Sequence, residues 1–399
     1  MHPANAADGA VTMVTASLRW RHVWRNQGHG FNGSYRVETD KMARNYSIIV
    51  GTGSYIPSRR VHNSEFLEHE FYDSEGKLLS QPNEEIVRTF AKITGIDERR
   101  YVTDDLVTSD IASYAAADAL ESSGIDRETL DFIVVAHNFG DVKADDRSVD
   151  LVPSLAARVK KRLEIQNPAT VALDMAFGCP GWLEGMIQAD YCLRCGDAKR
   201  VLVIGAETLS RVSDPHDRDS MIYADGAGAT IVEATQSSTP VGILSHVTRS
   251  DAEHASLLHM GRSNKRDNSS DGLFLKMEGH KLYEYAIGTV PGVVKESLEK
   301  AGLPLRDVSK VLFHQANEKM DEAMLKRLYR LCGEEKIADR IMPMTISWLG
   351  NSSVATLPTL LDLLLKGKLE NHGLKKGDNV VFASVGAGMN INSLVYRMP

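Results

Sequence analysis

The chain has 399 residues, of which 43 % are hydrophobic and 25 % are charged, a composition typical of a folded globular protein. Its formal net charge of −7 argues against general nucleic-acid affinity, which depends on a clustered basic surface. Four cysteines do not make a secreted disulfide framework in a chain of this length, and no apolar run of about 18 residues could span a membrane, so we expect a cytoplasmic protein.

Residues 1–42 are predicted to be an N-terminal extension that is poorly ordered. The short apolar run at 11–18 lacks the preceding basic residue of a signal peptide, and a basic, aromatic segment follows it at 19–25. We expect the fold to begin near residue 43.

An internal duplication organises the rest of the chain. Segments 120–137 and 298–315 both read as a helix end, a capping glycine, a short polar loop and a buried strand. The offset is constant at 178 residues, so that Gly124 corresponds to Gly302. This period is far longer than that of a repeat array and predicts two similar halves, at 43–235 and 236–399.

Further segment pairs support the duplication. A predicted strand at 171–175 leads to Cys179, and its counterpart at 341–346 leads to Asn351. Segments 200–205 and 379–384 both read as buried strands. Strands alternating with helices predict parallel sheets with covered faces, in which functional residues gather at the carboxyl ends of the strands.

Cys179 follows the first of these strands and stands directly before Pro180, which is tolerated at a helix start because it has no N–H to leave unpaired. A helix N-terminus favours a thiolate through its dipole and free backbone donors, so we predict a reactive cysteine. The competing interpretation is a small buried hydrophobic residue, which is the role of most free cysteines.

His314 ends the predicted strand 311–313, where a histidine is often structural. The matching position in the first half is Ala136, so the duplication does not require an imidazole there, which favours a functional role. Asn351 precedes a predicted helix at 353–365 and could also be its N-cap. Together with the glycine loop 386–388, these residues occupy strand ends that could converge on one cleft.

The residues then match a known family. From Tyr46 to Met398 the chain resembles the β-ketoacyl-acyl-carrier-protein synthase III group of the thiolase superfamily. The resemblance implies an α/β thiolase fold whose duplicated βα halves form five layers, α-β-α-β-α. The segments that carry it are 51–57, 94–99, 178–181, 214–218, 225–229, 314–317, 350–353 and 386–388.

The resemblance also implies a chemical mechanism. Cys179, His314 and Asn351 would form a catalytic triad, and the backbone N–H groups of Cys179 and Gly388 an oxyanion hole. An acyl group on the cysteine would condense with a malonyl- or β-ketoacyl thioester that loses CO2, in fatty acid or polyketide-type biosynthesis, with neither a metal nor a cofactor. The substrate-binding residues that we expect are Gly279, Phe177, Trp182 and Met389.

Departures from the family pattern concern the substrate. Lys92-Ile93 precede Thr94 where members carry an arginine, and no tryptophan lies between residues 61 and 94, which puts recognition of coenzyme A in doubt. Residues 389–392 and Trp348-Leu349 also differ from the pattern. We therefore expect a primer other than acetyl-coenzyme A, and an alternative is a ketosynthase that condenses two longer acyl thioesters to a dialkylresorcinol precursor.

The expected partners are acyl-coenzyme A or an acyl-carrier protein, and a second copy of the chain in a homodimer. Basic residues after Asn317 would dock the acidic carrier protein, although interspersed acidic residues also fit a solvated helix face. The expected docking residues are Lys319, Lys326 and Arg327.

Other functions are less well supported. The segment 51–53 lacks the third glycine of a dinucleotide-binding motif, and Cys192 and Cys195 fit core packing better than a zinc site. A degradative thiolase would need a cysteine near the carboxyl end, and a 3-hydroxy-3-methylglutaryl-type synthase a glutamate base, for which Glu184 and Glu207 are unsupported candidates. A non-catalytic thiolase-fold subunit usually lacks the cysteine that this chain keeps.

Overall fold

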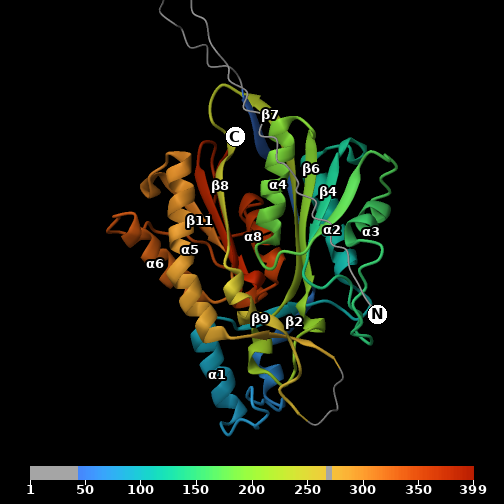
Figure 1. The fold of residues 1–399 in the computed structure, drawn as a ribbon, viewed down its shortest axis with the longest axis vertical. Coiled ribbons are helices and arrows are strands. Elements are labelled where there is room, and N and C mark those ends of the chain that lie inside the picture. Colours follow the sequence, from blue (N-terminus) through green and yellow to red (C-terminus); the bar gives the residue numbers. More distant parts are fainter. Residues whose placement is uncertain (1–43, 267–271) are drawn as a thin grey trace, which may run out of the picture. The chain divides into compact units, whose positions relative to one another are not determined.

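Two β-sheets with helices between them and on both outer faces make up the fold of this computed structural model, which describes residues 44–266 and 272–399 (Figure 1). The predicted extension 1–42 lies outside the described residues. The first sheet has the strand order β1-β7-β6-β4-β5. Its strands are β1 (Arg44–Tyr55), β7 (Asp225–Ser237), β6 (Arg200–Thr208), β4 (Phe132–Ala136) and β5 (Val171–Met175).

The second sheet has the order β11-β12-β13-β8. Its strands are β11 (Val308–Phe313), β12 (Asn379–Gly386), β13 (Asn390–Arg397) and β8 (Gly242–Ser250). Two short antiparallel pairs stand apart from the large sheets. They are β2 (Arg59–His62) with β3 (Glu98–Tyr101), and β9 (Leu258–Gly261) with β10 (Phe274–Met277).

The helices complete five layers, as predicted. Helices α2 and α3 cover the outer face of the first sheet, α5 and α6 cover that of the second, and α4 and α8 lie between the sheets (Figure 1). Because α8 is buried on all sides, its sequence is apolar almost throughout. The helices are α1 (Asn83–Thr94), α2 (Thr108–Ser123), α3 (Leu155–Arg162), α4 (Gly181–Cys195), α5 (Gly279–Ala301), α6 (Glu318–Leu331), α7 (Ile346–Leu349) and α8 (Thr356–Leu365).

The pairing of the strands shows the duplication directly. In the first sheet β1 and β6 both pair antiparallel with β7, and β6 pairs parallel with β4. The second sheet repeats this pattern with β8, β13, β12 and β11. The matched glycines Gly124 and Gly302 both cap their helices in the left-handed conformation, with φ of 64° and 67°. The predicted boundary at 235/236 falls inside β7, and residues 43–399 form one compact unit.

The strand predicted at 341–346 is wrong. This segment lies beside β11, where Ile341 accepts a hydrogen bond from Val311 N at 2.9 Å, but it forms no β-ladder and leads into the short helix α7. Pro343 has no N–H, and the N–H groups of Thr345 and Ile346 donate to the side-chain oxygen of Gln315 at 2.6 and 3.0 Å. A buried side chain therefore takes the hydrogen bonds that a neighbouring strand would have made.

Two further predictions need correction. The helix expected at 353–365 begins as a 3-10 turn at Ser353–Ala355, and α8 follows it. Of the two cysteines on α4, Cys192 packs against the central core as expected, whereas Cys195 is exposed. Among the residues that the structure describes, no helix combines the length and the apolar character needed to cross a bilayer.

The close approach of α8 to the first sheet generates a testable prediction. A Cβ atom on Gly228 of β7 would lie 2.6 Å from Thr359 N, so Gly228→Ala should lower the free energy of unfolding by about 1–3 kcal/mol through overpacking. Gly292 in α5 has open space around its Cα, so Gly292→Ala should raise that free energy by about 0.5–1 kcal/mol. Urea unfolding of both variants checks the pair, and equal effects would contradict the packing argument.

Candidate active site

Cys179 lies between the end of β5 and the start of α4, where Pro180 is the N-cap residue. The end of β12 packs directly onto it. A Cβ on Gly386 would lie 2.5 Å from Cys179 N, and one on Gly178 would lie 2.7 Å from Ala387 N. Only glycine at both positions allows the two backbones to approach this closely.

One cavity of about 60 Å³ is lined by Cys179, His314 and Asn351. Cys179 follows β5, His314 follows β11, and Asn351 follows α7. The first comes from one half of the chain and the other two from the second half. The structure thus brings together the three side chains that the sequence placed at separate strand ends.

Burial keeps the cysteine and the histidine uncharged. It raises the pKa of the Cys179 thiol to about 11 and lowers the pKa of the His314 imidazole to about 4. At rest, the removal of water outweighs the effect of the helix N-terminus on this thiol, and the reactivity of Cys179 stays a prediction. Near neutral pH the pair consists of a thiol and a neutral imidazole.

A hydroxyl group fixes the ring of His314. Its Nδ1 lies 2.7 Å from Thr356 Oγ1, and the same hydroxyl lies 3.0 Å from the carbonyl oxygen of Ser353. When the hydroxyl donates to the carbonyl, Nδ1 must carry the hydrogen and Nε2 is a free base. When the hydroxyl donates to Nδ1, the hydrogen of the imidazole is on Nε2.

Hydrogen bonds of both the N–H and the carbonyl group of Asn351 fix its backbone. Its N–H donates to Ile222 O at 3.0 Å, and its carbonyl oxygen accepts from Ala224 N at 2.8 Å. Its side-chain oxygen accepts from Ser353 N at 2.8 Å, a local turn that resembles the capping role considered as an alternative. Since this oxygen is engaged, the NH2 group is what the side chain can offer to a ligand.

The glycine loop is placed differently from the prediction. Among the described residues, Gly386 and Ala387 line the cavity and Gly388 does not. Gly388 has a φ of 79° and turns the chain towards β13, so that a Cβ there would meet the side chain of Asn390. The expected second oxyanion donor, Gly388, thus lies outside the described lining of the cavity, whereas Ala387, whose N–H lies beside Gly178, belongs to it.

Of the four expected substrate contacts, the described lining of the two cavities at the site includes only Gly279, at the start of α5. Trp182 is 1 % exposed and packs against Phe382 with ring centroids 5.9 Å apart, because its position on α4 faces the second sheet. Met389, which directly follows the glycine loop, is fully buried, and Phe177 is half-buried outside both cavities. The predictions for Phe177, Trp182 and Met389 are thus not supported.

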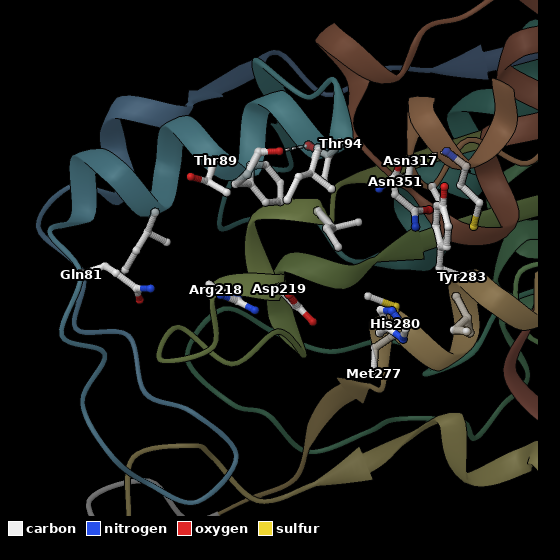
Figure 2. A pocket seen from close by; sticks show the side chains of 18 of the residues that line it. Gln81, Thr89, Thr94, Arg218, Asp219, Met277, His280, Tyr283, Asn317 and Asn351 are labelled. Carbon is white, nitrogen blue, oxygen red and sulfur yellow. Dashed lines mark hydrogen bonds between the residues drawn. The ribbon is translucent and has the colours of Figure 1, made fainter. Parts of the chain in front are cut away.

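A larger cavity of about 500 Å³ opens beside the small one (Figure 2). Helix α1 forms one wall with Thr89 and the exposed Ile93, and α5 and α6 form others. Arg218 and Asp219 lie next to each other in its lining, and burial raises the pKa of the Asp219 carboxyl to about 6. The residues that line both cavities are Met277, Leu282, Ala316, Met320 and Asn351.

Sequence reasoning missed several polar residues at the nucleophile. Ser353 donates a hydrogen bond to Cys179 Sγ at 3.2 Å. Asn138, which lines the small cavity, follows β4 at the position that the duplication matches to Ala316, so the rule that singled out His314 could also have found it. Glu207 was considered from the sequence only as a catalytic base, and its contacts with Asn138 become visible only in the folded structure.

The three expected docking residues lie exposed on α6. Lys326 pairs with Glu322 at 3.6 Å, a contact within one helix turn. The same helix turns Met320 towards both cavities. The basic face of α6 is therefore exposed to solvent, whereas its buried face contributes to the lining of the cavities.

Comparisons with known proteins agree with this geometry. Residues 173–252 match the 3-oxoacyl-[acyl-carrier-protein] synthase III family, and residues 298–398 match the C-terminal region of that family. The chain is 31 % identical over 355 residues to the β-ketoacyl-[acyl-carrier-protein] synthase III of Cereibacter sphaeroides, covering 88 % of this chain and 98 % of that protein.

Solved structures give the same result. The 3-oxoacyl-[acyl-carrier-protein] synthase III of Aquifex aeolicus has a TM-score of 0.71 at 28 % identity, covering 88 % of this chain and 99 % of its own. The priming β-ketosynthase of a polyketide pathway has a TM-score of 0.73 at 26 % identity, covering 92 % and 99 %. Xanthomonas campestris OleA, at 19 % identity, TM-score 0.69 and coverages of 90 % and 98 %, shares the fold. The chain belongs to the 3-oxoacyl-[acyl-carrier-protein] synthase III family of thiolase-fold condensing acyltransferases.

Proposed function

We propose that Cys179 carries the acyl group of this condensing enzyme and that His314 and Asn351 hold the second thioester while it loses CO2. The observation that supports this most strongly is the single cavity lined by all three side chains. Their roles follow from chemistry that neutral groups can perform in a site without bulk water.

In the first half-reaction the thiol proton of Cys179 passes to Nε2 of His314, and the sulfur attacks the carbonyl carbon of the acyl thioester. The N–H groups of Cys179 and Ala387 stabilise the oxyanion. When the tetrahedral intermediate collapses, the departing thiolate takes the proton from His314. The imidazole can act as this base because burial keeps it neutral and Thr356 can hold its hydrogen on Nδ1.

In the second half-reaction a malonyl-type thioester loses CO2 and leaves an enolate. The Asn351 NH2 group and His314, now in the tautomer with its hydrogen on Nε2, donate to the enolate oxygen. The carbanion attacks the acyl carbon on Cys179, whose sulfur leaves as a thiolate and regains a proton from solvent. Neutral donors suit this step, because a fixed positive charge would also hold the carboxylate that must depart. Each donor contributes on the order of 3 kcal/mol.

The proposed acyl donors are thioesters of coenzyme A or of an acyl-carrier protein, which would enter through the large cavity. Exposed Lys319, Lys326 and Arg327 on α6 support carrier docking, and the exposed Arg218 in the lining of the large cavity offers a cation to a phosphate. The small cavity beside Cys179 suits a short acyl group, and the flexible side chains of Met277 and Met320 give room for a longer one. We also propose a homodimer, which sizing at micromolar protein would test.

Acyl labelling tests the role of Cys179. Wild-type protein incubated with acyl-coenzyme A and acyl-carrier donors should gain the mass of one acyl group, located on the Cys179 peptide by mass spectrometry. Cys179→Ala should lose this label and at least a thousandfold of condensing activity. Labels on Cys192, Cys195 or Cys332 instead, or no label with any donor, would favour a non-catalytic subunit.

The proton position on His314 gives a second test. Thr356→Val keeps the volume but removes the hydroxyl, so both half-reactions should slow by roughly 10- to 100-fold, the value of one or two lost hydrogen bonds. Acylation and malonyl decarboxylation are measured separately. Thr359→Val, one turn further along α8, is the matched control and should change neither rate by more than about twofold. A Thr356→Val enzyme with both rates intact would contradict the proposed role.

A further inference from the structure

Ser353 contacts two members of the proposed triad, Cys179 and Asn351, and is linked to the third, His314, through Thr356. Its hydroxyl lies 3.2 Å from Cys179 Sγ, its N–H donates to Asn351 Oδ1 at 2.8 Å, and its carbonyl oxygen lies 3.0 Å from the Thr356 hydroxyl beneath His314. The side chain is 3 % exposed, and φ of 51° places the residue in the left-handed region. Non-glycine residues adopt this conformation at a cost, and active sites are among the places where such residues cluster.

A second chain of hydrogen bonds determines which way the Ser353 hydroxyl points. Asn138 Nδ2 lies 2.5 Å from Glu207 Oε2 and 3.1 Å from Ser353 Oγ. An amide nitrogen only donates, so it gives one hydrogen to the carboxyl group and the other to the serine oxygen. The serine hydrogen is then free for Cys179 Sγ, which receives it.

Glu207 anchors this amide. Its carboxyl group accepts the backbone N–H of Asn138 as well as the side-chain NH2, which leaves the asparagine little freedom to rotate. Glu207 is 1 % exposed, and burial raises the pKa of its carboxyl to about 7. The two hydrogen bonds that this carboxyl accepts from Asn138 point to a positioning role.

We propose that Ser353 is a positioning residue whose hydroxyl, directed by Asn138 and Glu207, donates to the sulfur of Cys179 and so stabilises its thiolate. Ser353 donates to this sulfur in the structure and can continue to do so while the proton of the thiol is on His314. The donation opposes the larger effect of burial, which raises the pKa of the thiol. The inference rests on the proposed function in one respect, namely that the thiolate of Cys179 is the nucleophile.

Alkylation of Cys179 tests this inference without requiring catalysis. Rates with iodoacetamide are measured from pH 7 to 10 by peptide mapping, with the exposed Cys195 as an internal reference. Below the pKa of the thiol, the rate follows the thiolate fraction. In Ser353→Ala and Ser353→Gly, Cys179 should react roughly tenfold more slowly at each pH, as for a pKa raised by about one unit, while Cys195 is unchanged.

The two substitutions separate chemistry from folding. Glycine adopts a φ of 51° freely, so Ser353→Gly keeps the backbone contacts even if alanine strains them. Ser384→Ala removes another buried hydroxyl, one with no hydrogen-bond partner among the described residues, and should react like the wild type. The same fold-change with the bulkier N-ethylmaleimide shows that access to the sulfur has not changed.

Asn138 completes the test. Asn138→Ala should slow alkylation in the same direction, and the double variant with Ser353→Ala should be no slower than Ser353→Ala alone, because the two act through one hydroxyl. Unchanged or faster alkylation of Cys179 in both Ser353 variants would overturn the proposal. Acyl labelling of Cys179 is scored separately, so a failure of the proposed function and a failure of this inference give different results.

Discussion

The contact between the end of β12 and the backbone of Cys179 is the constraint on which the site depends. It joins the two halves of the duplicated fold at the point where their functional residues meet. Because Gly178 and Gly386 have no Cβ, the backbones approach closely enough for the glycine loop to line the same cavity as the cysteine. A side chain at either position would separate the two strand ends and, with them, the nucleophile from His314 and Asn351.

Burial determines the protonation states of the functional groups at this junction. Burial moves the pKa values of Cys179 and His314 in opposite directions, and both groups are uncharged at rest as a result. A buried ion pair would demand a large desolvation cost, whereas neutral groups need only hydrogen-bond partners. Thr356 and Ser353 supply those partners, and the hydroxyl of Thr356 can reverse its direction as the proton moves.

Much of the architecture was predictable because the sequence repeats itself. The offset that relates Gly124 to Gly302 correctly predicted paired helix ends and strands, and the strand-end rule led to Cys179 and His314. Asn351 was found although the strand expected before it is absent.

What could not be predicted depends on contacts between distant residues. Gln315 accepts hydrogen bonds from the backbone at the start of α7, and the local sequence of that segment does not predict this contact. Trp182 and Met389 lie close in sequence to site residues but face the core, because the direction of a side chain depends on the packing of whole layers. The Asn138 and Glu207 contact likewise joins the ends of two different strands.

The order of strands in the two sheets has a consequence for biosynthesis. Strand β1 pairs with β7, so Arg44 must wait for Ser237 before the first sheet can close, and β8 must wait for β13 at the end of the chain. The long segments between these strands lose entropy before the strand pairing can compensate for the loss. Folding is slow for this reason. During translation the first sheet can close well before the second. Until β13 has been synthesised, β8 has an unpaired edge, and such an edge needs protection from self-association.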